Sequence, residues 1–461
     1  MNYINEAKKY EKEFLEDLKE IVAVPSLRNI EEASENAPFG KECRKVLDIM
    51  LNKAKEEGFK VKDYAGYAGV IEYGEGEETV GILGHLDVVP IGEGWSKDPL
   101  GCEMEGGYVF GRGVLDDKGP TLCGYYALKM IRDLNIKLKR RILLIMGCDE
   151  ESGMQCMDYY KKHGEIPTMG FTPDADFPVI YGEKGILSVH LKGKSNTAIK
   201  SMHAGERQNI VIGKATALIE SMDEKQEVLF EYYLAANNLT GSINRKEDGV
   251  EITVNGKYMH AAYCYAGVNA ALHLLNYVGC AYNDKMAKTL YDLLIHWDGR
   301  GLEIDIFGAY MGFLTMNTGI INVENNEFDV TLDIRYPNDT DGEKLTSTIK
   351  NTLEKYNTGI DVVSTNDSKP LFVDPNSKLV KDLMASYHKY SGDVFSPAKT
   401  MGGGTYARKF DNFVAFGPEF PIREKTSFDV GGPHEKDEGV KVDDLMKAIA
   451  IYADAIEKLG N

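Results

Sequence analysis

The chain has 461 residues, 43% of them hydrophobic and 27% charged, so we expect about two or three globular domains with substantial cores. Its formal net charge of -19 argues against a protein that binds nucleic acid through clustered lysines and arginines. No apolar run approaches the roughly 18 residues of a membrane helix, and the charged N-terminal stretch lacks a signal-peptide core, so we expect a cytoplasmic protein without a membrane partner.

Helix and strand patterns alternate in the first part of the chain. Apolar residues recur three and four positions apart over 7–24, 38–57, 119–134 and 153–163, which predicts helices. Short apolar runs at 78–86, 140–147 and 178–182 predict buried strands. Strands buried on both faces are typical of parallel sheets flanked by helices.

The pattern changes after about residue 184. Polar and apolar residues alternate at 250–258 and 327–337, as in a sheet covered on one face. The earlier character returns near 370, with a helix at 377–390, a strand at 412–416 and a helix at 442–458. We therefore expect an α/β fold in which a discontinuous domain, 1–184 and 370–461, has a mixed, largely parallel sheet flanked by helices, and residues 185–369 form an inserted α+β domain.

The stretch "GHLDVVP" places His85 and Asp87 two positions apart at the end of a predicted strand. In an extended segment such residues project from the same face. Ligands bind at the carboxyl ends of strands in open α/β sheets, so the pair is a candidate site. A buried histidine satisfied by a hydrogen bond to the aspartate explains the same pattern equally well.

Two further motifs place acids beside predicted elements. "GRGVLDDKGPT" puts Asp116 and Asp117 just before a helix, where aspartate also serves as an N-cap. "CDEES" puts Glu150 and Glu151 after an apolar strand, where the dipole of the next helix also favours acids. Because neighbouring residues at a strand end cannot face the same point, we expect one glutamate to bind a cation and the other to contact water.

Two glycine- or proline-rich turns add Asp174, in "TPDADFP", and His434, in "GGPHEKDE". The seven cysteines form no C-x-x-C pair, which argues against a thiolate zinc site. Histidine and carboxylate side chains without thiolates suit a pair of hydrolytic divalent metals. No H-E-x-x-H helix or G-x-S-x-G elbow offers a competing chemistry.

In this order the motifs closely resemble the M20 metallopeptidase family, and within it the PepV-type dipeptidases. With the opening segment "EIVAVPSL", the resemblance runs from residue 20 to 438. It implies that Asp116 bridges two metal ions, that His85 and Asp174 complete one site, and that Glu151 and His434 complete the other.

The resemblance also implies roles around the metals. Glu150 would be the general base that takes a proton from metal-bridging water, and Asp87 would orient His85 through its other ring nitrogen. A cis peptide is expected between Asp116 and Asp117.

The inserted domain would be the family's lid. "GKYMHAAYCYAG" resembles a family segment that points to His260 as the group stabilising the oxyanion, although this chain has alanine where the family has serine, and tyrosines follow. Asn209 would bind substrate. Arg335 and the backbone of the loop from Gly402 to Thr405 would bind the substrate's free carboxylate, although a surface ion pair explains Arg335 equally well. The substrate-binding loop residues are Gly403, Gly404 and Thr405.

The resemblance thus implies a dinuclear metal-dependent dipeptidase, with Zn or Mn as the metals and Co as a further option. The alternatives are an N-acyl amino-acid deacylase or an aminopeptidase of the same family, and a non-enzymatic binding protein. A small peptide is the expected partner, and the size of the insert is similar to that of monomeric PepV-type enzymes.

Overall fold

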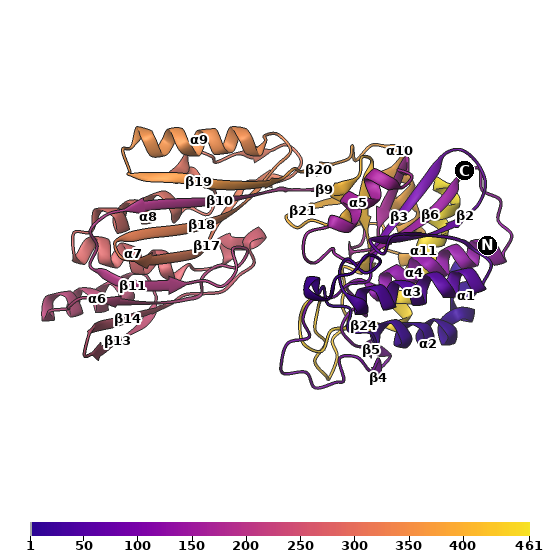
Figure 1. Ribbon diagram of the computed structural model, residues 1–461, viewed down its shortest axis with the longest axis horizontal. Coiled ribbons are helices and arrows are strands. Elements are labelled where there is room, and N and C mark those ends of the chain that lie inside the picture. The colour runs from indigo at the N-terminus through magenta and orange to yellow at the C-terminus, as the bar shows by residue number, and fades with distance from the viewer. Residues whose placement is uncertain (1) are drawn as a thin grey trace. The chain divides into compact units, whose positions relative to one another are not determined.

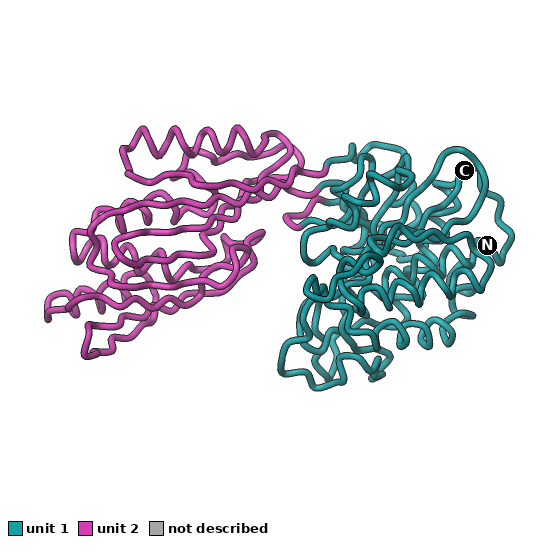
Figure 2. Tube along the Cα trace, in the orientation of Figure 1, with its two compact units in different colours: residues 1–182, 372–399, 404–461 teal, residues 183–371, 400–403 magenta. Residues whose placement is uncertain are grey.

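Residues 2–461 are described from a computed structural model, in which the chain forms two compact units (Figure 2). Unit 1 holds the chain up to Gly182, Phe372–Lys399 and Gly404–Asn461. Unit 2 holds Glu183–Leu371 and Thr400–Gly403. Each unit has a large sheet and helices of its own (Figure 1).

The main sheet of unit 1 is mixed. Strands β6, β3, β7 and β22 are parallel to one another in its centre, while β1, β2 and β9 are antiparallel to their neighbours. The central strands are apolar and buried, as the uninterrupted apolar runs predict. In spatial order the strands are β1 (Lys60–Tyr64), β2 (Ala68–Tyr73), β6 (Arg141–Gly147), β3 (Thr79–His85), β7 (Met169–Thr172), β22 (Phe413–Phe416), β9 (Val179–Glu183) and β20 (Leu371–Phe372), with β21 (Lys399–Met401) also paired to β9.

Helices cover both faces of this sheet. A methyl group built on Gly84 would lie 2.0 Å from Thr121 Oγ1 of α4, whereas one on Gly147 would lie 2.9 Å from Cys156 Sγ of α5. These glycines lie on opposite faces, because Gly84 pairs with Met146 and side chains alternate along a strand. The helices of unit 1 are α1 (Tyr3–Ala7), α2 (Glu11–Val22), α3 (Lys41–Glu56), α4 (Lys118–Asp133), α5 (Gln155–His163), α10 (Lys378–Ser391) and α11 (Val442–Leu459).

Two small sheets complete unit 1. They comprise β4 (Glu103–Glu105), β5 (Tyr108–Phe110) and β24 (Gly439–Lys441) in one, and β8 (Ala175–Asp176) with β23 (Pro418–Glu419) in the other. The predicted α/β class, with a mixed sheet flanked by helices, is confirmed. The predicted helices and strands are present, with ends shifted by a few residues, but the helix expected over 7–24 is divided, because a 3-10 turn at Lys8–Tyr10 separates α1 from α2.

Unit 2 is built on an antiparallel sheet with one buried face. Along β10 and β14 buried residues alternate with more exposed ones, and the buried set packs with α7, α8 and α9 in one core. The sheet order is β13 (Thr240–Lys246), β14 (Gly249–Asn255), β12 (Lys214–Ile219), β11 (Ile199–Ala204), β17 (Thr315–Glu324), β18 (Glu327–Tyr336), β10 (Gly185–Lys194) and β19 (Ile360–Ser368).

The other elements of unit 2 are a hairpin of β15 (Phe307–Gly308) and β16 (Gly312–Phe313) and the helices α6 (Glu224–Ala236), α7 (Ala270–Ala281), α8 (Lys285–Leu294) and α9 (Gly342–Lys355). Over residues 2–461, no helix combines the length and the apolar character needed to cross a membrane.

Candidate dinuclear metal centre

Three neighbouring parallel strands of unit 1 bring candidate ligands to one edge of the sheet. His85 is the last residue of β3, Glu150 and Glu151 follow β6, and Asp174 follows β7. Strand β3 lies between β6 and β7, so the carboxyl ends of all three meet. This is the edge where ligands bind in open α/β sheets.

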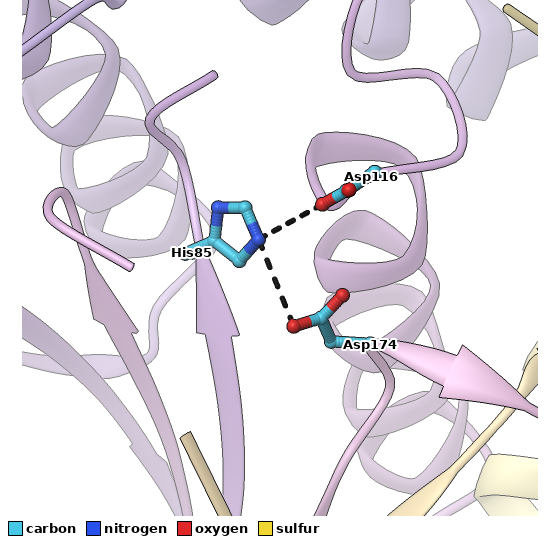
Figure 3. Close-up of side chains that lie close together, drawn as sticks. All are labelled: His85, Asp116 and Asp174. Atoms are coloured by element: carbon cyan, nitrogen blue, oxygen red, sulfur yellow. Dashed lines mark ion pairs between the residues drawn. The ribbon is translucent and has the colours of Figure 1, made fainter. Parts of the chain in front are cut away.

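Asp116 lies at the centre of the group. Its Oδ1 is 3.0 Å from His85 Nε2, and its Oδ2 is 3.0 Å from His434 Nε2. Asp174 Oδ2 approaches His85 Nε2 at 3.8 Å, and Figure 3 shows both carboxylates directed at the same ring nitrogen. Each oxygen of Asp116 therefore faces a different imidazole, which is the arrangement of a carboxylate that bridges two cations.

The second imidazole belongs to a loop of unit 1. His434 Nε2 lies 3.0 Å from Glu151 Oε1 as well as from Asp116, and its side chain is 53% exposed. The residues thus form two clusters that share Asp116 and whose candidate ligand atoms lie within 4.8 Å of one another: His85, Asp116 and Asp174, and Asp116, Glu151 and His434. The predicted metal ligands are brought together in the predicted grouping.

The tautomer of His85 tests whether a cation fits. Its Nδ1 lies 3.0 Å from the backbone carbonyl of Asp87. A carbonyl only accepts hydrogen bonds, so Nδ1 carries a proton, and Nε2 is the ring nitrogen that would bind a cation. That Nε2 is buried, makes no hydrogen bond and faces two carboxylates. A divalent cation would satisfy all three groups, so the donor set fits.

The charges of the cluster also favour a bound cation. Burial acts to raise the pKa of Asp116, but the imidazoles of His434 and His85 outweigh burial and hold it below its ordinary value. Burial raises the pKa of Asp174 well above its ordinary value, and the Asp116 carboxylate adds to this. Asp116 and Glu151 raise the pKa of His434 to about 10. Crowded carboxylates that compete for two imidazoles are a suitable environment for divalent cations.

Glu150 differs from the candidate ligands, because it belongs to neither cluster of ligand atoms. Burial raises its pKa well above the ordinary value, and the nearby Glu151 and Asp116 carboxylates add to this, although His85 opposes it. A glutamate with a raised pKa beside a candidate metal site is suited to proton transfer.

Asp87 contacts more than the imidazole. Its Oδ1 lies 3.5 Å from His85 Nδ1, which is nearer to the Asp87 carbonyl. Its two carboxylate oxygens accept the backbone N–H groups of Glu150 and Glu151, each at 3.2 Å. Asp87 is therefore connected to both the histidine and the paired glutamates.

The neighbouring Asp117 holds β3 against α4. Its Oδ2 accepts the His85 N–H at 2.9 Å and the Thr121 hydroxyl at 2.8 Å. The expected cis peptide between Asp116 and Asp117 is present. Asp116 thus faces the imidazoles, while Asp117 joins two backbone elements.

Two buried residues that sequence reasoning missed support the loop that carries Asp116. Glu438 Oε1 accepts the backbone N–H groups of Gly113, Leu115 and Asp116 at 3.0, 2.9 and 3.1 Å. Its Oε2 accepts a hydrogen bond from the buried Arg112 at 2.6 Å. Glu438 follows His434 by four residues, and the sequence signal that could have found it is the acid-rich end of "GGPHEKDE".

In unit 2, two predicted substrate residues are neighbours. Ala261, which follows His260 in the chain, donates its N–H to the Asn209 carbonyl at 2.8 Å. The exposed His260 ring accepts a hydrogen bond through Nδ1 from the Ala262 N–H at 3.2 Å. His203 is exposed on β11, and its Nδ1 lies 3.1 Å from the Asn322 Oδ1.

Arg335 is also in unit 2 and is buried. Its guanidinium donates to both carboxylate oxygens of Asp333, at 2.5 and 2.8 Å, and through Nη1 to the Gly402 carbonyl at 3.0 Å. Arg335 does form an ion pair, as the alternative explanation expects, but this pair is not on the surface, because both residues are buried. The predicted carboxylate-binding loop crosses the unit boundary, with Gly403 in unit 2, and Gly404 and Thr405 in unit 1.

Sequence comparison defines the class of protein. The model of peptidase family M20/M25/M40 matches residues 81–458. A Staphylococcus aureus (strain bovine RF122 / ET3-1) protein named "Putative dipeptidase" is 36% identical over 470 aligned residues, which cover 98% of this chain and 97% of the relative. The chain therefore belongs to peptidase family M20/M25/M40, as the motifs predict, and is a hydrolase of the metallopeptidase class.

Solved structures agree on the fold. The di-peptidase Dug1p of Saccharomyces cerevisiae matches with a TM-score of 0.59 at 14% identity, covering 100% of this chain and 98% of that one. Human carnosine dipeptidase 1 matches with a TM-score of 0.54 at 16% identity, covering 100% and 99%. Because these sequence identities are low, the structural matches support the fold and nothing further.

Proposed function

We propose that the protein is a dinuclear metal-dependent dipeptidase that hydrolyses the peptide bond of dipeptides with free termini. The observation that carries the proposal is Asp116, whose two oxygens each lie 3.0 Å from a different imidazole in a chain of family M20. The relative named as a dipeptidase, which matches nearly the whole chain, supports the substrate class.

Two clusters would hold the metals: His85, Asp116 and Asp174 hold one ion, and Asp116, Glu151 and His434 hold the other. When bound, two such ions polarise the scissile carbonyl and lower the pKa of a water molecule toward neutrality. Histidine and carboxylate donors without thiolate suit Zn or Mn, and Co as well.

The residues of the chain would then move the proton and bind the substrate. Glu150 takes a proton from the attacking water and passes it to the leaving amine, a step that its raised pKa supports. Asp87 keeps the His85 tautomer and holds the backbone of Glu150. His260 stabilises the oxyanion of the tetrahedral intermediate. Asn209 binds the substrate near it.

Arg335 and the loop through Gly403, Gly404 and Thr405 bind the free C-terminal carboxylate. The guanidinium of Arg335 has five N–H donors. Three of them bind Asp333 and Gly402, so two remain for a substrate carboxylate. Recognition of a free carboxylate on the residue that follows the scissile bond would select for dipeptides.

The test is a Glu150→Ala variant, with Glu165→Ala as the control at an exposed glutamate of the same unit. Glu150→Ala should retain about two equivalents of metal and lose at least about a hundredfold in kcat, whereas Glu165→Ala should behave as the parent protein. Near-normal kcat in Glu150→Ala would refute its role. A panel of dipeptides, tripeptides and N-acetyl amino acids assayed with the parent protein separates a dipeptidase from an aminopeptidase or a deacylase.

A further inference from the structure

Unit 2 contains a pocket of about 380 Å³, and part of its wall is aromatic. Tyr263, Tyr265, Trp297 and Phe313 line it. The Trp297 ring centroid lies 5.5 Å from that of Tyr265 and 5.8 Å from that of Phe313, so the rings form a continuous surface. Tyr263, Tyr265 and Phe313 are each 54% exposed. Aromatic side chains that gather around a hollow and remain half exposed are typical of a ligand pocket.

The pocket lies between two groups that the proposed function uses. Ala262 lines it and donates its N–H to the His260 ring at 3.2 Å. Gly402 lines it too, and the Gly402 carbonyl accepts from Arg335 at 3.0 Å. These two boundaries are close together, because a methyl group built on Gly402 would lie 2.7 Å from the Ala262 Cβ. The pocket therefore adjoins both the oxyanion group and the carboxylate group.

The covalent structure of a dipeptide decides which side chain reaches the pocket. Only the amide nitrogen and the Cα of the C-terminal residue separate the scissile carbonyl from the free carboxylate. A substrate with its carbonyl at His260 and its carboxylate at Arg335 must therefore place that Cα between them. The side chain on this Cα would then start beside Ala262 and Gly402, which line the pocket.

We propose that this pocket holds the side chain of the C-terminal residue of the substrate and selects aromatic and large apolar residues there. The inference rests on the proposed dipeptidase function and adds the substrate class. Burial of a ring against Trp297 and Phe313 removes apolar surface from water and allows edge-to-face ring contacts.

Lys184 sets a second limit on the substrate. It lines the pocket, and its ammonium donates to the Phe313 carbonyl. Burial lowers the pKa of this ammonium. A lysine or arginine side chain in the pocket would bring a second cation into a partly desolvated space. Substrates with a basic C-terminal residue are therefore disfavoured.

The experiment compares kcat/KM of metal-loaded protein for Ala-Phe, Ala-Ala, Phe-Ala and Ala-Lys. The test variant is Tyr263→Ala/Phe313→Ala, and the matched control is Tyr232→Ala, an aromatic residue of α6 in the same unit that is 70% exposed and lies outside the pocket. Thermal melting verifies that each variant is folded. Tyr263→Phe, which keeps the ring, is the conservative variant.

The parent protein should prefer Ala-Phe to Ala-Ala by at least about tenfold, and Ala-Lys should be a poorer substrate than Ala-Phe. The double variant should lose most of the preference for Ala-Phe and much less of the activity on Phe-Ala, whereas Tyr232→Ala and Tyr263→Phe should keep the preference. An unchanged preference in the folded double variant, or equal losses for Ala-Phe and Phe-Ala, would overturn the pocket assignment. Absence of turnover of every dipeptide by the parent protein would overturn the proposed function and the pocket assignment with it.

Discussion

Replacement of Glu438 by glutamine tests how the loop that carries Asp116 is held. Glu438 is buried, accepts three backbone N–H groups from this loop and pairs with the buried Arg112. The amide keeps the shape of the side chain but removes its charge. It also presents an NH₂ group to donors that need an acceptor.

The expected cost follows from these contacts. Removal of the charge opposite a buried arginine costs about 3–5 kcal/mol. Hydrogen bonds to the carboxylate become weaker neutral ones, but these losses overlap with the first and do not add fully. At about 2–4 °C per kcal/mol for a domain of this size, Glu438→Gln should lower the Tm by about 6–20 °C. Because the loop carries a predicted metal ligand, the affinity for metal should also fall by about tenfold to a hundredfold.

Thermal melting with excess divalent metal and isothermal titration of the metal-free protein measure these effects. The control is Glu32→Gln in the same unit, which removes the same charge from an exposed ion pair with Lys41 at 3.2 Å. Such pairs contribute about 0–1 kcal/mol, so the control should melt within about 4 °C of the parent protein. If Glu438→Gln melts and binds metal as Glu32→Gln does, then the carboxylate does not hold the loop.

Two further predictions concern the metals and the packing of the sheet. A chelator should lower the Tm of protein held at a metal concentration of about 100 Kd by about 5–11 °C for each ion removed, because binding at one site contributes about 2.7 kcal/mol. The shift should be smaller for His434→Ala, whose side chain is half exposed, and equal shifts would contradict the ligand assignment. Gly84→Ala should destabilise the protein by about 1–3 kcal/mol in denaturant unfolding, because its methyl group would lie 2.0 Å from Thr121 Oγ1. The control is Gly124→Ala, whose methyl group would have its nearest contact at 3.3 Å and should cost less. Equal stability of the two variants would count against this packing.

The strand-end ligands could be predicted because the signal is local. An apolar run followed by His85, or by Glu150 and Glu151, predicts a buried strand that ends in a polar group. Parallel strands then bring such ends to one edge without further information. The grouping around Asp116 needed the family resemblance, since nothing in the spacing of the motifs states which oxygen faces which imidazole.

The support of the Asp116 loop could not be predicted in the same way. Glu438 and Arg112 are 326 residues apart, and each is charged in a segment that otherwise suggests an exposed turn. Charged residues are seldom fully buried, so composition predicts the wrong environment for both. Only the folded chain shows that they neutralise each other.

The aromatic pocket of unit 2 shows an intermediate case. Tyr263 and Tyr265 are visible in the sequence as a departure from the family pattern. Trp297, Phe313 and Lys184 come from distant segments, so the sequence does not predict that they line the same pocket. The pairing of Arg335 with Asp333 was within reach, because residues two apart in a strand share a face.

Asp87 shows why one pattern had two explanations. The period of a strand places His85 and Asp87 on one face, and this spacing alone fits a buried pair as well as a site. The pair is buried, yet the backbone carbonyl of Asp87 lies against His85 Nδ1 while its carboxylate accepts the amides of Glu150 and Glu151. Its carbonyl holds Nδ1 of His85, so that Nε2 faces the carboxylates, and its carboxylate fixes the backbone of the proposed base. The two explanations are therefore compatible, because the buried pair connects the candidate metal ligand to the proposed base.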